Sequence, residues 1–343
     1  MGPATLKDIA KELNISVSTV SRALRDSYEI NSETKRVVME CAARLHYRPN
    51  PIALSLKGGS SSKAIGVIVP QVANYYFSQA IDGIEEVANQ RGYDVLIFQT
   101  HEAYDREVAN LRQALARRVD GLLISLSSET NDVSHLQELQ QQGTPIVQFD
   151  RVSAALDTPR VVAGNFDGAF AATQHLLQSG RRRIAHLTIQ PWLSITQERL
   201  AGYRAALAQA GVPYDERLVR FGTLGPGEMG PLVEELLAQR PAPDAFFTAS
   251  DQLVVGCLAA LRQRRVRIPD DVSLIGFTNL TVADLLSPPL STVVQPATEI
   301  GRVAVGQLLD LIEKKHHANP PATLTIPTTL VLRESSVRPA VVA

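Results

Sequence analysis

Near the N-terminus of this chain, two hydroxyl groups and one guanidinium are spaced so that they share one face of a helix. Val17, Ser18, Ser21 and Arg22 fall on one face of an expected helix. Side chains of this size and polarity can enter the major groove of DNA, where they contact base edges and phosphates. The spacing therefore indicates a DNA-reading helix, although short amphipathic helices also occur in helical domains that bind no DNA.

Two short helices joined by a tight turn are needed to present that face. Thr5 and Asp8 have the spacing of a capping box at the start of the first helix. Asn14 tolerates the left-handed backbone of a sharp helix end, and Ser16 can cap the second helix. The apolar positions of the two helices are expected to face each other, namely Leu6, Ile9, Ala10, Leu13, Val20 and Leu24.

A third helix is expected from Asn31 or Ser32 to near His46, with a buried stripe of Val37, Val38, Cys41, Ala42 and Leu45. Beyond it, Asn50 can cap, Pro51 can begin and Gly58 can end a further helix. That helix has only about two turns, which is too short to be stable alone in water. We predict that it forms conditionally and that a flexible tether follows over 58–62, with a plain linker as the alternative.

Length and charge place a small basic module on a larger acidic body. The chain has 343 residues and net charge −1, and the part up to Lys63 holds ten Lys and Arg against six Asp and Glu. This leaves about +4 on the first part and −5 on the rest, as a localised nucleic-acid contact requires. Arginine runs at 181–183 and 262–265 end expected helices, and we predict solvated helix ends there rather than a second DNA site.

Cysteine usage and hydropathy exclude several classes of protein. Cys41 and Cys257 provide no disulfide framework and no metal-ligand spacing. No signal peptide is recognisable, and no apolar run reaches the roughly 18–20 residues of a membrane span. The expectation is a cytoplasmic protein without membrane contact, metal or cofactor.

From Lys63 onward, apolar runs alternate with helical patterns. Runs buried on both faces and joined by helices predict a parallel sheet with right-handed crossovers. One series of runs lies at 64–70, 94–98, 121–126 and 145–149, and a second begins near Val161 and continues at 183–187, 245–249 and 272–277. We therefore predict an α/β body of two doubly wound lobes.

Ligands of such sheets bind beyond the carboxyl ends of the strands. The polar and aromatic residues that follow expected strands are Asn74, Tyr75, Phe77, Asp150, Trp192, Arg199 and Asp251. An Arg–Asp pair with an aromatic wall suits a sugar, because the charges bind hydroxyl pairs and the ring covers an apolar face. Structural alternatives remain: both aspartates can cap helices, Arg199 can join an ion pair, and Phe77 and Trp192 can be packing residues.

These motifs resemble the lactose/galactose/purine repressor (LacI) family of bacterial transcription regulators. The resemblance is carried by TLKDIA, SxxTVSRAL, HYRPNPIA and the leucine before the glycines, and it continues to near Arg338. It implies a helix-turn-helix head over 1–48, a hinge helix and linker over 49–62, and a body over 63–338 like periplasmic sugar-binding proteins. The chain should cross between lobes near 162, 290 and 325, which gives an N-lobe of about 63–161 and 291–324 and a C-lobe of about 162–290 and 325–338.

The same resemblance assigns DNA contacts. Val17, Ser18 and Arg22 would meet base edges, and phosphates would be contacted by Thr5, Leu6, Ser16, Thr19 and Ser21. Asn50, Ala53 and Leu56 would lie in the minor groove, where Leu56 would act as an apolar wedge that kinks the duplex. Val17 departs from the long polar residues of some members and would offer an apolar contact, for example to a thymine methyl. Its alternative is helix packing in step with Val20 and Leu24.

The resemblance also bears on the ligand. Arg199 in ERLAGY and Asp251 in ASDQ match family positions that meet ligand, and Gln295 lies in a crossing, where it can alternatively begin the helix over 297–312. Most members place an aspartate after VSLIGF, whereas this chain has Thr278, a weaker acceptor. Leu193 and Leu224 replace two residues expected of a purine-binding member. The pattern favours a sugar or sugar derivative.

The resemblance implies a ligand-controlled transcription regulator, usually a repressor, that binds a pseudo-palindromic operator as a homodimer. No nucleophile elbow, Walker loop or GxGxxG motif after a strand indicates an enzyme. Three alternatives remain: a solute-binding module, a sugar-modifying enzyme with a fused DNA-binding head, and a ligand-blind architectural DNA binder. The basic head argues against the solute-binding module.

Overall fold

The computed structural model describes residues 4–24, 26–47, 61–222, 228–277, 280–313 and 322–337. Residues 1–62 and 63–343 form two compact units, the head and the body. Asn50, Ala53, Leu56 and Thr278 lie outside the described residues. Within the described part of the chain, no helix combines the length and apolar character needed to cross a membrane.

The head consists of α1 (Leu6–Leu13), α2 (Val17–Ala23) and α3 (Ser32–Arg44). Both expected helix starts are present, because Thr5 and Asp8 form a capping box and the Ser16 side chain accepts a hydrogen bond from the amide of Thr19. Asn14 ends α1 in the left-handed conformation, at φ 51°. The three helices enclose a small core, centred on Ile9, Ala10, Val20, Ala23, Val38, Cys41 and Ala42.

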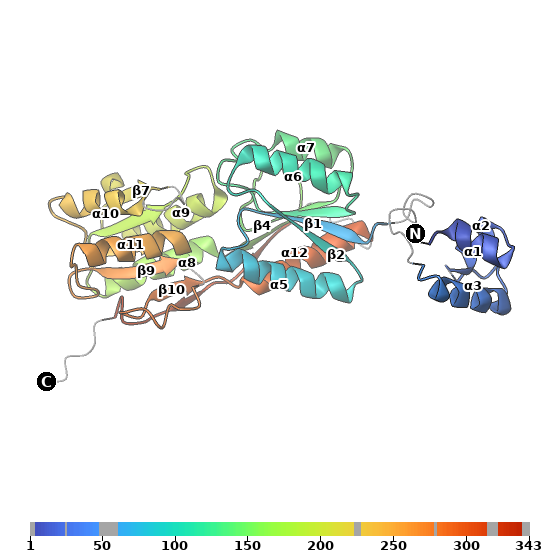
Figure 1. Ribbon diagram of the computed structural model, residues 1–343. Helices are drawn as coiled ribbons and strands as arrows, with labels where there is room; N and C mark the ends of the chain where they lie inside the picture. The colour runs from blue at the N-terminus through green and yellow to red at the C-terminus, as the bar shows by residue number, and fades with distance from the viewer. Residues whose placement is uncertain are drawn as a thin grey trace. The chain divides into compact units, whose positions relative to one another are not determined.

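The N-lobe is a parallel six-stranded sheet in the order β11-β5-β4-β3-β1-β2. Its strands are β1 (Ala64–Val69), β2 (Asp94–Gln99), β3 (Gly121–Ile124), β4 (Ile146–Phe149), β5 (Arg160–Ala163) and β11 (Thr323–Ile326). One face packs against α5 (Tyr75–Gln90) and α12 (Ala297–Ile312). The other face packs against α6 (Tyr104–Ala116) and α7 (Ser134–Gln141), so helices cover the sheet on both sides (Figure 1).

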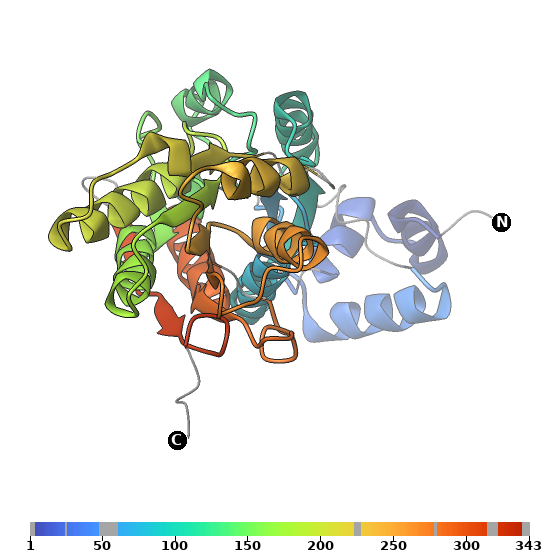
Figure 2. The ribbon, with the colours of Figure 1, turned by 90° about the vertical axis from the view of Figure 1, so that its left-hand side faces the viewer.

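The C-lobe repeats this plan with strand order β12-β10-β9-β8-β6-β7. Its strands are β6 (Ile184–Thr188), β7 (Val219–Phe221), β8 (Ala245–Thr248), β9 (Ser273–Phe277), β10 (Ser291–Val294) and β12 (Thr329–Val331). A short 3-10 helix, η1 (Glu216–Leu218), precedes β7, and β12 pairs antiparallel with β10. Figure 2 shows the sheet between α8 (Asn165–Gln178) with α9 (Ser194–Gln209) and α10 (Met229–Ala238) with α11 (Asp251–Gln263).

The chain passes between the lobes three times, a few residues later than the sequence suggested. β5 still belongs to the N-lobe sheet, so the first crossing is at Gly164. β10 pairs with β9 in the C-lobe, which moves the second crossing to Gln295 and Pro296. The third lies between β11 and β12, at 327–328. The apolar runs locate these strands, but pairing with neighbouring strands decides where each one ends.

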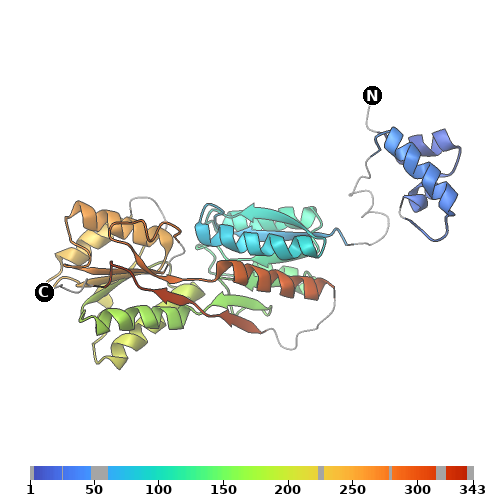
Figure 3. The same ribbon diagram turned by 90° about the horizontal axis from the view of Figure 1, so that it is seen from below.

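In the N-lobe, α5 and α12 lie side by side with their backbones in contact (Figure 3). A Cβ atom on Gly83 would lie 2.1 Å from the carbonyl oxygen of Thr298, and one on Gly301 would lie 2.1 Å from that of Ala80. Only glycine fits either position. Arg91, which follows α5, donates to Asp310 at 2.9 Å and to Glu313 at 2.6 Å, so the far ends of the pair are also joined.

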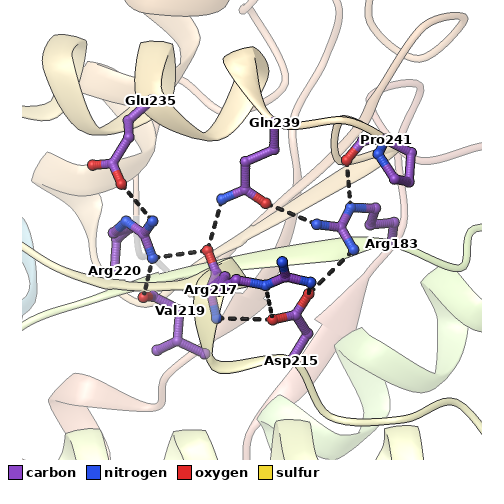
Figure 4. Close-up of polar contacts among 8 residues, drawn as sticks. All are labelled: Arg183, Asp215, Arg217, Val219, Arg220, Glu235, Gln239 and Pro241. Carbon is purple, nitrogen blue, oxygen red and sulfur yellow. Dashed lines mark hydrogen bonds and ion pairs between the residues drawn. The ribbon is translucent and has the colours of Figure 1, made fainter.

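The arginine run at 181–183 ties segments of the C-lobe together. Arg181 is 7% exposed and donates to the Ser273 hydroxyl at 3.0 Å and to the carbonyl of Pro269. Arg183 donates to the Pro241 carbonyl at 2.6 Å and to the Gln239 side chain at 2.8 Å (Figure 4). The prediction of solvated helix ends is therefore wrong for Arg181, because backbone carbonyls brought together by the fold bind its guanidinium.

Candidate functional sites

The face of α2 opposite the head core carries the groups expected to read DNA. Ser18 and Arg22 are exposed and Ser21 is half-buried. Val17 is half-buried and packs against the head core, which supports its role as a packing residue while leaving part of it accessible. The Arg22 guanidinium lies 3.1 Å from the Glu29 carboxylate, and both side chains are about half exposed. Sequence reasoning missed Glu29, which follows α2 in an irregular segment.

The expected phosphate contacts surround the two helix starts. Ser16 Oγ accepts from the Thr19 amide at 3.0 Å and lies 2.9 Å from Thr19 Oγ1. Thr5 Oγ1 donates to Asp8 at 2.7 Å, and Leu6 is half-buried against the head core. A hydroxyl both donates and accepts, so Ser16 can cap α2 and still donate to a phosphate. The helix N-terminus adds a favourable dipole for an anion.

A cavity of about 40 Å³ lies between the lobes at the carboxyl ends of both sheets. The sequence-predicted residues that line it are Asn74, Phe77, Asp150, Arg199, Asp251 and Gln295. Tyr75 is not part of this lining and borders a neighbouring cavity instead, whereas Tyr76 lines the inner one. Trp192 also lies elsewhere. The cavity further includes Arg151, which sequence reasoning passed over although it directly follows Asp150.

The first turn of α5 forms one wall of the cavity. The Asn74 side chain accepts from the amide of Tyr76 at 2.9 Å and so caps the helix. Tyr76 and Phe77 are 5% and 2% exposed. The Tyr76 hydroxyl is buried near the Asp150 carboxylate, but it makes no hydrogen bond of ordinary geometry with a described residue. Burial, and next the charge of Asp150, raise the pKa of Tyr76, so this hydroxyl stays protonated and can donate a hydrogen bond.

Asp150 is buried, at 5% exposure, and lies directly after β4 with φ 60°. No helix begins there, so the alternative that it caps a helix is not what the structure shows. Ser125 donates to it at 3.5 Å, and Arg151 Nε lies 4.0 Å away. Burial raises the pKa of Asp150 against the lowering effects of Arg151 and Arg199. Asp251 opens α11, whose cap is the side chain of Ser250.

Arg199 projects from α9 and is only 3% exposed. Its Nε donates to Asn165 at 2.9 Å, its Nη1 donates to the Ala249 carbonyl at 2.5 Å, and its guanidinium lies 3.8 Å from the centroid of the Phe277 ring. In the described structure no carboxylate pairs with it and its Nη2 makes no hydrogen bond. Burial lowers the pKa of Arg199 to about 10. The expected alternative, a structural ion pair, is therefore absent from the described residues.

Arg151 lines the inner cavity, but its guanidinium is bound by Glu102. Its Nη1 and Nη2 donate to the two carboxylate oxygens of Glu102 at 2.6 and 3.1 Å. Burial raises the pKa of Glu102, but the Arg151 guanidinium outweighs this effect, so the pKa of Glu102 lies below its ordinary value. This buried pair fixes the loop that carries Asp150. Among the described residues, Arg199 has no carboxylate within ion-pair distance, although the charge of Asp150 still acts on it.

Trp192 lies outside this cavity and is 42% exposed. Its indole Nε1 donates to the carbonyl of Ser128, in the other lobe, at 3.0 Å. It lines a separate cavity of about 540 Å³ that is formed by both lobes and shares no lining residue with the inner one. The expected ligand contact by Trp192 is thus not made in the inner cavity.

The inner cavity places a buried carboxylate and a buried guanidinium in opposite lobes. Asp150 accepts hydrogen bonds, whereas Arg199 and Tyr76 donate them. A molecule with several hydroxyl groups can satisfy both kinds of group at once. No group of three or more His, Cys, Asp or Glu side chains suited to a metal ion occurs among the residues described.

Comparison with known proteins gives two family matches. Residues 5–50 match the family described as bacterial regulatory proteins, lacI family. Residues 62–334 match the family described as periplasmic binding proteins and sugar binding domain of LacI family.

Similar proteins cover nearly the whole chain. The HTH-type transcriptional repressor PurR of Vibrio parahaemolyticus serotype O3:K6 (strain RIMD 2210633) is 31% identical over 92% of this chain and 93% of its own. The ribose operon repressor of Haemophilus influenzae (strain ATCC 51907 / DSM 11121 / KW20 / Rd) is 33% identical over 97% and 98%. The lac repressor dimer bound to operator and the anti-inducer ONPF is 25% identical, with TM-score 0.83 over 98% of this chain and 100% of that one.

Proposed function

We propose, since the chain belongs to the LacI family of bacterial regulatory proteins, that it is a transcriptional repressor whose affinity for operator DNA is set by a small polyhydroxylated effector. It binds a pseudo-palindromic operator as a homodimer, because a two-fold dimer presents two identical reading helices. It acts in the cytoplasm, where the chromosome is, and it works by binding without chemical turnover.

The opposed positions of Asp150 and Arg199 at the inner cavity carry the proposal of a polyhydroxylated effector. Each of these groups is buried and has its pKa displaced by burial, and each lines the inner cavity between the lobes. A sugar hydroxyl accepts from Arg199 while another donates to Asp150, so one ring compensates both buried charges. The sugar-binding description of the matching family and the ribose operon repressor among the relatives support this choice.

The proposed effector-binding residues are those that line the inner cavity, namely Asn74, Tyr76, Phe77, Asp150, Arg199, Asp251 and Gln295. The proposed DNA-binding residues of the head are Thr5, Leu6, Ser16, Val17, Ser18, Thr19, Ser21 and Arg22. Asn74, Tyr76, Phe77 and Asp251 lie at helix starts, as do Thr5, Leu6, Ser16, Val17, Ser18 and Thr19.

Coupling between the two sites follows from lobe closure. An effector that contacts both lobes stabilises one degree of closure over others, and it can shift the equilibrium only by its difference in affinity for them. The two heads of a dimer then fit one operator in only one of the arrangements. A coupling free energy of about 1–3 kcal/mol is typical of such systems.

The proposal is tested in two steps on the full chain. Selection from a random duplex library should recover a pseudo-palindrome, and thermal-shift screening of sugars and nucleobases should identify a stabilising compound. A ligand at 100 times its dissociation constant adds about 2.7 kcal/mol to the unfolding free energy, which such a screen detects. The compound should then change operator affinity. A protein that binds no duplex more tightly than random sequence would contradict the proposal.

A further inference from the structure

Two residues at the start of α9 connect the C-lobe to backbone groups of the N-lobe. Trp192 Nε1 donates to the Ser128 carbonyl at 3.0 Å, and Ser194 Oγ accepts from the Val152 amide at 3.1 Å. From these contacts we infer that Trp192 and Ser194 form a clasp that holds the two lobes closed beside the effector cavity. The inference deepens the proposed function, on which its biological meaning rests.

The N-lobe side of the clasp is held firmly. Ser128 donates its amide to Glu102 at 2.8 Å, and Ser127 donates its amide to the fully buried Glu107 at 2.7 Å. Glu102 also binds both terminal nitrogens of Arg151, the residue before Val152. The carbonyl and the amide that the clasp engages are therefore positioned before the C-lobe reaches them.

The C-lobe side is anchored on either side of the clasp residues. Leu193 and Ile195 are 3% and 5% exposed and belong to the apolar core beneath α10 and α11. Trp192 itself is 42% exposed and joins no apolar core, although an indole ring normally gains stability from burial. Its hydrogen bond across the lobes is the contact that explains its position.

The clasp directly adjoins the residues of the inner cavity. Val152 comes two residues after Asp150, and Ser194 comes five residues before Arg199 on the same helix. Closing the clasp therefore sets the separation of the two opposed charges. The inner cavity of about 40 Å³ is far below the roughly 300 Å³ or more of usual ligand sites. The two lobes must therefore separate for an effector to enter, which breaks the contacts of the clasp, and re-forming these contacts then helps to retain the effector.

The cavity of about 540 Å³ lies on the outer side of the clasp and includes Trp192 and Ser194 in its wall. Trp192 and Ser194 are thus positioning residues, because they act on the effector through the closure that brings Asp150 and Arg199 together.

The experiment uses reciprocal readouts on the full chain without effector or DNA. Trp192→Phe removes the indole donor, and hydrogen exchange of the Val152 amide is measured by mass spectrometry. Ser194→Ala removes the acceptor of that amide, and acrylamide quenching of Trp192, the single tryptophan of the chain, is measured. For each variant, the measurement therefore reports on the other of the two inter-lobe hydrogen bonds, which the substitution does not remove.

The matched control is Gln197→Ala, which removes a hydrogen bond within the same segment, from Gln197 Nε2 to the Pro191 carbonyl at 3.2 Å. It crosses no lobe boundary. Trp192→Phe should speed exchange at Val152 roughly three- to tenfold, the equivalent of one lost hydrogen bond. Ser194→Ala should increase quenching of Trp192 and shift its emission to longer wavelength. Gln197→Ala should do neither.

The clasp is overturned if either cross effect is missing, since the two contacts would then open independently. It is equally overturned if Gln197→Ala produces the same changes, because the effect would belong to the local loop. Melting temperatures verify that each variant is folded, and Ser194→Ala carries the test alone if Trp192→Phe does not fold. Because neither DNA nor effector is present, this outcome is separate from that of the proposed function.

Discussion

The head presents its charged groups to water, whereas the inner cavity of the body holds them away from it. The Arg22 side chain is 54% exposed and forms an ion pair with Glu29, whose side chain is 47% exposed. Arg199 is 3% exposed, binds neutral partners, and has its pKa lowered to about 10 by burial. An arginine in the head therefore makes a weak contact that is easily exchanged for another. The arginine in the cavity makes buried contacts that are costly to lose.

This difference teaches how the free energy of each recognition step is distributed. An exposed ion pair is worth about 0–1 kcal/mol, so the head has to sum many modest contacts along the DNA backbone. A buried charge left without its partner costs several kcal/mol, so a few groups dominate effector binding. Substitutions in the cavity should accordingly have larger effects than substitutions in the head.

The largest effect is expected for Arg199→Met. The variant loses charge-assisted hydrogen bonds to the effector, which weakens effector binding about 100-fold, or about 3 kcal/mol. Calorimetric titration with the compound found by thermal-shift screening measures this change. Operator affinity without effector should be retained. Arg204→Met is the control, because Arg204 is exposed on the same helix and contacts Tyr214. An effector response that survives Arg199→Met would remove this residue from the site.

A smaller, pH-dependent effect is expected for Asp150→Asn. The folded protein raises the pKa of Asp150, so ionisation of Asp150 lowers stability, and this penalty is fully present above the raised pKa. At pH 7.5 the variant should be more stable by about 1–2 kcal/mol. As the pH falls below the raised pKa the difference should shrink, and it should vanish below the ordinary aspartate pKa, where Asp150 is neutral in both the folded and the unfolded state.

Chemical denaturation at several pH values measures the difference between Asp150→Asn and the wild type. Asparagine also tolerates the left-handed backbone at this position, φ 60°, so the substitution adds little strain. The exposed Asp157→Asn is the control and should show no such pH dependence. A difference that stays constant with pH would show that Asp150 carries no ionisation penalty.

The smallest effect is expected in the head, for Glu29→Gln. The substitution releases Arg22 from its ion pair and removes a negative charge near the DNA-reading face, which should raise DNA affinity about two- to fivefold. Fluorescence anisotropy with a random duplex at about 0.1 M salt suffices, since the effect needs no specific sequence. Glu40→Gln, which breaks the Arg36 pair on α3, is the control. Lower affinity for Glu29→Gln would exclude Glu29 as a competitor of DNA.

Local patterns in the sequence were enough to predict the head and the parallel strands of the two sheets, but not the antiparallel β12. The capping box at Thr5 and the αL residue at Asn14 are short-range signals, and strands buried on both faces produce continuous apolar runs. The strand ends were harder to predict. β10 extends the C-lobe because Thr292 pairs with Gly276, and such pairing between distant segments is not a local property of the sequence.

The inner cavity was predictable to the level of segments but not of every side chain. Asn74 and Asp150 follow strands, as the position of a ligand site in parallel sheets requires. Tyr76 was missed, because a helix turns by about 100° per residue and its phase at the first turn depends on packing. The hydrogen bond from Arg151 to Glu102 joins residues 49 positions apart, and no local spacing in the sequence predicts it.

The close approach of α5 and α12 at Gly83 and Gly301 makes the two helices one rigid pair. Its near end carries Tyr76 and the Gln295 crossing, both at the inner cavity. Its far end, roughly 24 Å away for a helix of 16 residues, leads through Tyr93 to Lys63, whose ammonium lies 4.2 Å from the centroid of that ring. If an effector tilts this helix pair at the cavity, we expect the tilt to displace Lys63, where the body begins.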